Sequence, residues 1–208
     1  LYYIDTLNDA LVLSANANSG TFVSVGALGV DLSAVASFDI FTSGGNQFGY
    51  VVASADGGST YSLYTVNLAT GALTATGAFP TGFEPTRGFA IVDRPEPTVP
   101  ARATGFAYNA AGQLFSFPLS DPSLVTPIGP AGQADVKGID FLPGSNTLYA
   151  ITVGQENSQL RIINLADGMT SSVGSGFANT SAMPGNYSIS PAAQFGFDFN
   201  PTTLQVDG

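Results

Sequence analysis

The sequence contains no histidine and no cysteine, and only 10% of its residues are charged. Without histidine, the chain cannot build a Ser-His-Asp or Cys-His nucleophile system, an imidazole general base or most zinc sites. Without cysteine, disulfide frameworks, thiol catalysis and thiolate metal sites are excluded as well. Only carboxylate chemistry or Ser/Lys chemistry remains for an enzyme built from this chain.

Positive charge is also scarce, because five basic residues face fifteen acidic ones and give a net charge of −10. The five are scattered along the chain, at Arg87, Arg94, Arg102, Lys137 and Arg161. No basic patch is available to neutralise phosphates, so we expect neither nucleic acid nor an anionic membrane surface as a partner. Lys137 has no paired Ser motif beside it and is interpreted as a surface charge.

Long apolar runs are missing, and no stretch approaches the roughly 18 to 20 residues of a transmembrane helix. The 208 residues, 44% of them hydrophobic, are enough for one domain with a full core. Its surface must consist mainly of Ser, Thr, Asn, Gln and Gly. The chain opens on "LYYID" without Met, and we expect a processed chain or the ordered part of a longer one. Low charge and the absence of cysteine agree with a protein exported from the cytoplasm.

Short runs rich in Val, Ile, Phe, Tyr and Thr recur between Gly, Pro, Asn and Asp, as in all-β proteins. Four of them begin with a small residue followed by an apolar one: "SFDI" from Ser37, "GFAIVD" from Gly88, "GIDF" from Gly138 and "GFDF" from Gly196. Their starts are 51, 50 and 58 residues apart. A repeat of this length with four strands is typical of a β-propeller blade.

A second landmark supports the same register. "YSLYTVNLATGALTATG" (61–77) and "SQLRIINLADGMTSSVG" (158–174) both read as two strands around a Gly turn, and "DALVLSANANSGTFVSVG" (9–26) has the same form. The second strand of each pair ends in a glycine, and the segment "LVTPIG" also ends in a glycine. The four glycines are Gly26, Gly77, Gly129 and Gly174. Turns with positive φ require Gly or Asn, which explains the recurring corners.

The sequence therefore predicts an all-β propeller of four-stranded blades, about four to five in number. Three blades are complete within the chain. The N-terminal region supplies only the second to fourth strands of a blade ("LYYID", "ALVLS", "FVSVG"), and the C-terminal region only the first two ("FGFDF", "TTLQV"). We expect the incomplete terminal blade to be completed by the other end of the chain or by a neighbouring molecule.

One linker-like stretch divides the chain. Residues 94–102 lie within "DRPEPTVPARA", where proline removes ladder donors and stiffens the backbone. The prediction is two groups of blades, 1–93 and 103–208, packed together as one propeller. The longest irregular insertion is loop 178–194, which carries the sequons of Asn179 and Asn186. Such loops lie on one rim of a propeller and often bind ligands.

The sequence motifs of the repeats resemble those of a known family, domain of unknown function 4394, which is found in bacterial secreted proteins. "GIDFLPGSNTLYAI", "INLADG", "VGSGFA" and "FGFDFNPT" are similar to its N-terminal half. "LYYIDTLNDALVL", "GTFVSVGALGVDL", "LYTVNLATGALTATGAF" and "RGFAIVD" are similar to its C-terminal half, so the order is inverted. The resemblance implies a propeller and a window across two tandem or permuted copies. Because the family has no assigned activity, it implies no functional residue.

Asp39, Asp140 and Asp198 occupy the same place in three repeats and are the candidate binding residues. As a ring of carboxylates at a central channel they would hold a cation or a sugar hydroxyl. The alternative, which we favour, is a hydrogen bond from each Asp to the backbone of a neighbouring blade. Ala90 stands at the fourth position, and a ring with one member missing makes a poor metal site, so we predict no metal site.

Two further features have structural explanations. The acidic turn "SADGGST" (54–60) lacks the alternating Asp pattern and closing Glu of a calcium loop, and hairpin chemistry accounts for it. Tyr64, Phe115, Tyr149 and Phe197 fall at strand spacing, which favours a core between blades over a carbohydrate-stacking platform.

These observations favour a non-catalytic binding or assembly module outside the cytoplasm, with other protein subunits or copies of itself as partners, no catalytic residues and no cofactor. The alternative is a propeller hydrolase or lyase that acts on a glycan or lactone with carboxylates and a bound calcium ion. A carbohydrate-binding module, with a glycan as ligand, is the third hypothesis.

Overall fold

A computed structural model describes most of the chain. The described residues are 1–16, 20–33, 36–83, 86–92, 103–132, 136–153, 158–177, 197–199 and 206–207, the last pair by its backbone only. They form strands β1 to β17 and contain no helix. Within these ranges, therefore, no helix is long and apolar enough to cross a membrane.

The strands form four antiparallel sheets and one short ladder, each made of strands that are consecutive in sequence. We name them sheets A to E. Sheet A contains β1 (Tyr2–Asp5), β2 (Ala10–Leu13) and β3 (Val23–Ala27). Sheet B contains β4 (Ala36–Ser43), β5 (Asn46–Ser54), β6 (Tyr61–Val66) and β7 (Leu73–Ala78). Sheet C contains β8 (Thr86–Val92), β9 (Thr104–Asn109), β10 (Leu114–Pro118) and β11 (Thr126–Ile128). Sheet D contains β12 (Val136–Phe141), β13 (Leu148–Thr152), β14 (Ser158–Ile163) and β15 (Thr170–Phe177), and sheet E contains β16 (Asp198–Phe199) and β17 (Val206–Asp207).

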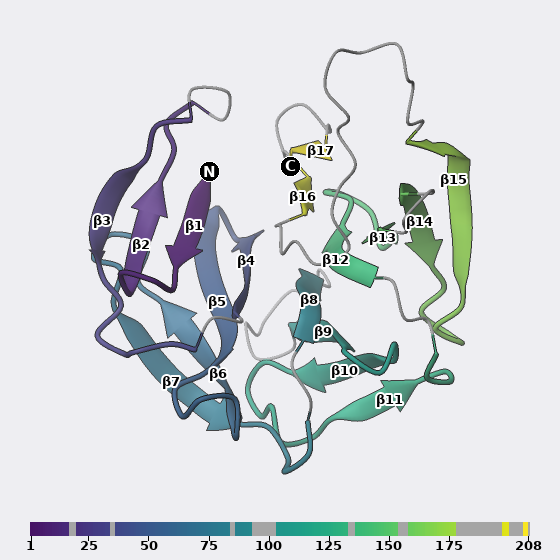
Figure 1. The fold of residues 1–208 in the computed structure, drawn as a ribbon, viewed down its shortest axis with the longest axis horizontal. Coiled ribbons are helices and arrows are strands. Elements are labelled where there is room, and N and C mark those ends of the chain that lie inside the picture. The colour runs from purple at the N-terminus through teal and green to yellow at the C-terminus, as the bar shows by residue number, and fades with distance from the viewer. Residues whose placement is uncertain are drawn as a thin grey trace.

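The sheets are arranged around a common centre (Figure 1). Their first strands lie innermost: β4 contacts β8, β8 contacts β12, and β12 contacts β16. The outermost strands, β3, β7, β11 and β15, lie at the periphery. In Figure 1, β1 and β17 both lie on the side where sheets A and D are separated.

Local sequence explains the hairpins that join the outer strands. Between β6 and β7, the Asn67 side chain accepts hydrogen bonds from the amides of Ala69 and Thr70, and Gly71 adopts a φ of +83°. Asn side chains stabilise such turns by bonding their own backbone, and glycine takes the left-handed conformation without a Cβ clash. The repeated "NLATG" and "NLADG" phrases are therefore turn signals.

Apolar side chains fill each space between neighbouring sheets. Leu11 of sheet A and Val51 of sheet B belong to one buried cluster, while Leu63 of sheet B and Phe117 of sheet C belong to the next. Sheets C and D share a third cluster that includes Phe106. Phe197 and Phe199 then cover part of the other face of sheet D. The inner three strands of sheets B and C thus pack against neighbours on both faces, which favours apolar residues at successive positions.

The glycine that opens two of the repeats allows two inner strands to approach closely. A Cβ at Gly88 would lie 2.7 Å from the main-chain nitrogen of Ile139, and one at Gly138 would lie 2.6 Å from Cβ of Phe197. Real Cβ atoms do not make contacts this short, so only glycine fits at these two positions. The spacing of the first strands at the centre depends on this close approach.

The expected all-β architecture is confirmed, with three sheets of four strands, three strands at the N-terminal end and two at the C-terminal end. Of the four aromatic residues predicted to be core, three belong to buried clusters and Phe115 is half-buried outside them. Tyr64 and Phe197 are buried, Tyr149 packs edge-on against Phe199, and Phe115 packs edge-on against Phe83. The proline-rich stretch 94–102 and the insertion 178–194, with Asn179 and Asn186, lie outside the described residues.

Candidate functional site

The three predicted aspartates converge at the centre of the molecule. Asp39 lies on β4, Asp140 on β12 and Asp198 on β16, which are all innermost strands. The charge of Asp198 acts on both Asp39 and Asp140, and Asp39 acts on Asp140 as well. We call these residues the central carboxylates.

Two central carboxylates hold the next inner strand by its backbone. Oδ2 of Asp39 accepts a 2.7 Å hydrogen bond from the amide of Ile91 on β8. Oδ2 of Asp140 accepts one of 2.7 Å from the amide of Phe199 on β16, and its Oδ1 accepts one from the amide of Phe141. These bonds between neighbouring sheets confirm the structural role predicted for Asp39 and Asp140.

Ala90 interrupts the pattern in sheet C. It is fully buried and has no side-chain acceptor to offer to β12. The amide of Phe141, the counterpart of Ile91 and Phe199, is bonded instead by the carboxylate of its own neighbour, Asp140. Asp140 therefore accepts hydrogen bonds from two backbone amides, which explains why this aspartate can be only 7% exposed.

The surroundings raise the pKa of both buried carboxyl groups. For Asp39, loss of hydration is the main cause and the charge of Asp198 adds to it, and the pKa rises to about 7. For Asp140, loss of hydration and then the charge of Asp39 raise the pKa to about 9, with further contributions from Asp198. The amide hydrogen bonds oppose these shifts without overcoming them. Protons are thus retained among the central carboxylates near neutral pH.

This arrangement is better suited to holding strands than to catalysis or cation binding. Oδ2 of each buried carboxylate is directed at a main-chain N–H, and protonation removes the negative charge that a cation would need. In the described part of the chain, no group of three or more acidic residues is arranged to hold a metal ion.

The acidic turn at 54–60 is organised by its own hydrogen bonds. Oδ1 of Asp56 accepts bonds from the Ser54 hydroxyl (2.6 Å) and from the amides of Ser59 (3.0 Å) and Thr60 (2.8 Å). The side-chain bond from Ser54 and the amide bond from Thr60 lower the pKa of Asp56 to about 2. The carboxylate of Asp56 therefore makes its hydrogen bonds within the turn, as the hairpin interpretation predicted.

Replacement of Asp56 tests this interpretation. In Asp56→Ala the amides of Ser59 and Thr60 lose their acceptor, so we expect their hydrogen exchange to accelerate at least several-fold while sheets C and D are unaffected. Asp56→Asn keeps one acceptor oxygen and should show a smaller effect. Hydrogen exchange of the Ser59 and Thr60 amides, measured by NMR or mass spectrometry, distinguishes Asp56→Ala from Asp56→Asn. Equal exchange rates in the wild type and in Asp56→Ala would contradict the role of the carboxylate.

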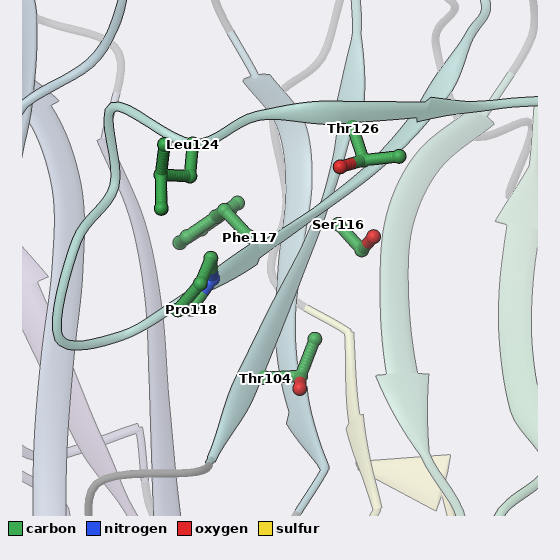
Figure 2. Close-up of a pocket in the computed structure, with 6 residues that line it drawn as sticks. All are labelled: Thr104, Ser116, Phe117, Pro118, Leu124 and Thr126. Carbon is green, nitrogen blue, oxygen red and sulfur yellow. The ribbon is translucent and has the colours of Figure 1, made fainter.

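A shallow hollow of about 310 Å³ lies on sheet C and is lined by residues from β9 to β11 and from the β10–β11 connection (Figure 2). Its lining residues are Thr104, Ser116, Phe117, Pro118, Leu124 and Thr126. Hydroxyl groups and apolar atoms line it, without an ionisable side chain. The hollow therefore has no residue that could act as a general acid or base.

A polar cluster on the outer strands of sheet D was not predicted from the sequence. The Arg161 guanidinium donates from Nη1 to the Thr170 hydroxyl and from Nη2 to the Gln159 side chain, each at 3.0 Å. Ser172 also donates to Gln159, and the buried Nε of Arg161 has no acceptor within hydrogen-bonding distance. The sequence did contain a signal for this cluster. Gln159 and Arg161 are two residues apart on β14, so their side chains lie on the same face of the strand.

Comparison with known families supports the resemblance seen in the repeats. The model of a domain of unknown function, DUF4394, matches residues 1–90 and 113–206, two segments that flank the proline-rich stretch. The chain belongs to the DUF4394 family. None of the curated proteins searched matches it. The DUF4394 match covers all three central carboxylates and the turn at Asp56, but not the part of the hollow formed by Thr104.

Proposed function

We propose that the five sheets are blades of a β-propeller and that this DUF4394 protein is a non-catalytic binding or assembly module that works outside the cytoplasm. The succession of inner strands β4, β8, β12 and β16 around one centre supports the propeller. Apolar layers between successive sheets support it as well, because propeller blades pack face to face.

One observation carries the non-catalytic assignment: the two buried central carboxylates bond the backbone of the neighbouring inner strand. A propeller hydrolase with a carboxylate pair would need at least one of them directed at substrate or metal. Asp39 and Asp140 instead use their oxygens to join β4 to β8 and β12 to β16. Because the chain contains neither histidine nor cysteine, no other general base or nucleophile of those kinds is available.

Composition supports a location outside the cytoplasm. The chain has a low charged fraction of 10% and no oxidisable thiol. Its sequence is rich in hydroxyl side chains, as in the turn "SADGGST". Fractionation of the source cells with an antibody against this chain tests the location, and recovery with cytosolic markers alone would contradict it.

Calcium binding and catalysis are tested together. We expect calcium to change the melting temperature by less than about 1 °C, because a site that binds only the folded state would raise it by mass action. We also expect no release of product from a panel of glycans and lactones. A calcium-dependent stabilisation that disappears in Asp39→Asn and Asp140→Asn would overturn the non-catalytic assignment and favour the hydrolase. Binding on a glycan array without turnover would identify a carbohydrate-binding module.

A further inference from the structure

Sheet A differs from sheets B, C and D at its inner edge. In those three sheets, a first strand (β4, β8 or β12) pairs with the second strand (β5, β9 or β13). In sheet A the corresponding second strand is β1, and no described strand pairs with its inner edge. The C-terminal strand β16 has the sequence of a first strand, but it pairs with β17. Among the described residues, sheet A therefore consists of a second, a third and a fourth strand.

Two residues of β1 direct their main-chain groups to this inner edge. Leu1 and Ser14 exchange two main-chain hydrogen bonds, of 2.8 and 2.9 Å. In an antiparallel pair, hydrogen-bonded positions alternate with positions whose N–H and C=O groups point to the other side. Tyr2 and Ile4 occupy the latter positions opposite β2. Their donors and acceptors are thus directed away from β2, where a further strand can pair with them.

The surroundings of this edge match those of a normal second strand. β1 contacts β4 of the next sheet, just as β9 of sheet C contacts β12 of sheet D. Because β8 pairs with β9 and also contacts β12, a strand paired with β1 would contact β4 in the same way. Figure 1 shows β1 on the inner side of β2, towards the common centre. The side chains of Tyr2 and Ile4 pack against the apolar cluster between sheets A and B, which holds the edge in place.

The adjacent strand β4 carries a main-chain donor that such a strand would meet. The amide of Ile91 on β8 donates to Asp39 of the preceding inner strand. The amide of Ile40 has the same position on β4, but it donates to its own neighbour, Asp39. Phe141 shows the same exception, because the inner strand that precedes it has no aspartate there. The Ile40 amide therefore marks the position at which the aspartate of a preceding inner strand can accept a hydrogen bond.

The register of an added strand follows from the alignment of sheets A and B. Ile4 and Gly26 lie in one row across sheet A, because both pair with Leu11. In sheet B, the row of the corresponding Gly77 begins at Val52. Ile4 of β1 is thus the counterpart of Val52 of β5.

The same alignment defines which residues an added strand must carry. Tyr2 is the counterpart of Tyr50, which pairs with Asp39 of β4. Two residues before Asp39, Ser37 pairs with the counterpart of Ile4. The first strands share the order small, apolar, Asp or Ala, apolar. An added strand with Asp at the third place would set this Asp opposite Tyr2 and its small residue opposite Ile4.

We propose that the inner edge of β1 accepts an extended segment of a partner protein with the order small, apolar, Asp, apolar. This inference rests on the proposed assembly function and names the chemistry of the partner. The segment runs antiparallel to β1, exchanges main-chain hydrogen bonds with Tyr2 and Ile4, and accepts one from the Ile40 amide through its aspartate. In strand addition, main-chain hydrogen bonds provide affinity and the side-chain pattern provides specificity. A second copy of this chain is a poor donor, because its own segment of this kind is held by the bond from Phe199 to Asp140.

A synthetic peptide with the sequence "QFGFDFNP", which is residues 194–201 of this chain, is the probe. Slightly acidic buffer keeps Asp39 and Asp140 protonated, so that they do not repel the aspartate of the peptide. Isothermal titration calorimetry with the intact chain should show saturable binding of one peptide. Hydrogen exchange of the Ile4 amide, followed by NMR, should slow at least about tenfold on saturation. The Tyr3 amide, which faces β2, should change little.

Two changes in the peptide test the two kinds of contact. Asp198→Ala in the peptide removes the acceptor for the Ile40 amide and should weaken binding about threefold to tenfold, the worth of one hydrogen bond. Methylation of the main-chain nitrogen of the same aspartate removes the donor to Tyr2 and blocks the close approach of the strands. The methylated peptide should not bind.

Ile4→Pro tests the edge on the protein side. It removes a main-chain donor that β2 does not use, and proline is tolerated on an edge strand when its nitrogen faces away from the ladder. We expect Ile4→Pro to lose peptide binding. Ile4→Val has a side chain of similar size and keeps the N–H, so this matched control should bind like the wild type. Circular dichroism and melting temperature verify that both variants fold.

Each outcome decides the inference. A wild-type chain that does not bind the peptide, or peptide binding that leaves the Ile4 amide exchange unchanged, overturns strand addition at β1. The exchange measurement uses the wild type and so decides even where Ile4→Pro fails to fold. Self-association of the wild type that the peptide disrupts would identify a second copy as the donor and overturn a separate partner. A negative result leaves the non-catalytic assignment standing, since the calcium and substrate assays test it separately.

Discussion

Replacing Gly88 by alanine should lower the free energy of unfolding by about 2–3 kcal/mol, the cost of forcing an extra methyl group into a packed interior. The new Cβ would lie 2.7 Å from the amide nitrogen of Ile139 and 3.2 Å from the carbonyl carbon of Gly138. Both are main-chain atoms of β12, which is fixed by pairing with β13. The reduced entropy of the unfolded chain favours alanine by only about 0.4–1 kcal/mol, so the clash dominates.

Gly77→Ala is the matched control. Gly77 also lies in a strand with an ordinary φ, but its Cβ would meet only the ring of Pro122, at 3.0 and 3.1 Å. A proline ring in a surface connection can move by a few tenths of an ångström, whereas a paired strand cannot. Thermal melts should show a decrease of roughly 4–10 °C for Gly88→Ala and little change for Gly77→Ala. Equal melting temperatures in the two variants would contradict the close packing of β8 and β12.

The second large effect is a loss of stability as the pH rises from 5 to 9. The folded-state pKa values of Asp39 and Asp140 lie above the unfolded value of 3.8, so the folded state binds more protons than the unfolded state in this range. Their stabilising contribution is complete below pH 3.8 and is lost as the pH rises through about 7 and then about 9. The loss continues across the whole interval, because the pKa of Asp140 lies above that of Asp39.

The composition of the chain makes the interval from pH 5 to pH 9 suitable for measuring this loss of stability. No histidine or cysteine titrates between pH 5 and 9, and the lowered pKa of Asp56 affects stability only as the pH falls towards about 2. Urea denaturation at several pH values should give a negative slope of stability against pH for the wild type. Asp39→Asn keeps an oxygen that can accept the Ile91 amide but cannot ionise, so its slope should be shallower.

Asp39→Asn should also lower the pKa of Asp140, because the charge of Asp39 is one of the causes that raise it. Carboxyl chemical shifts followed by NMR test this coupling directly. Asp31→Asn, at an exposed aspartate between sheets A and B, serves as the control and should reproduce the wild-type slope. A slope that is positive in the wild type, or unchanged in Asp39→Asn, would contradict a protonated centre.

Repetition made most of the strand order predictable. Once "SFDI", "GFAIVD", "GIDF" and "GFDF" were aligned, the turn glycines located the other strands, because hairpins need positive φ at fixed positions. The Asn67–Gly71 turn and the three strands of sheet A follow from the same local chemistry. The sequence also contained the signal for the central aspartates, which recur at one position of the repeat.

The role of these aspartates depended on distances that no local pattern contains. Oδ2 of Asp39 bonds an amide 52 residues away, and Oδ2 of Asp140 bonds one 59 residues away. Their raised pKa values result from burial and from one another's charges, which exist only when β4, β12 and β16 meet. The need for glycine at Gly88 was hidden for the same reason, because Ile139 is distant in sequence.

Composition and local pattern were enough to establish the all-β class, the repeat, the exclusion of histidine and cysteine chemistry, and the resemblance to a family without an assigned activity. These are local or compositional properties, set by propensity, turn chemistry and the residues present. Only the packing of the sheets shows which oxygens of the aspartates accept backbone hydrogen bonds and which glycines allow the inner strands to approach. Such properties arise from contacts between segments about 50 or more residues apart, which only packing of the sheets brings together.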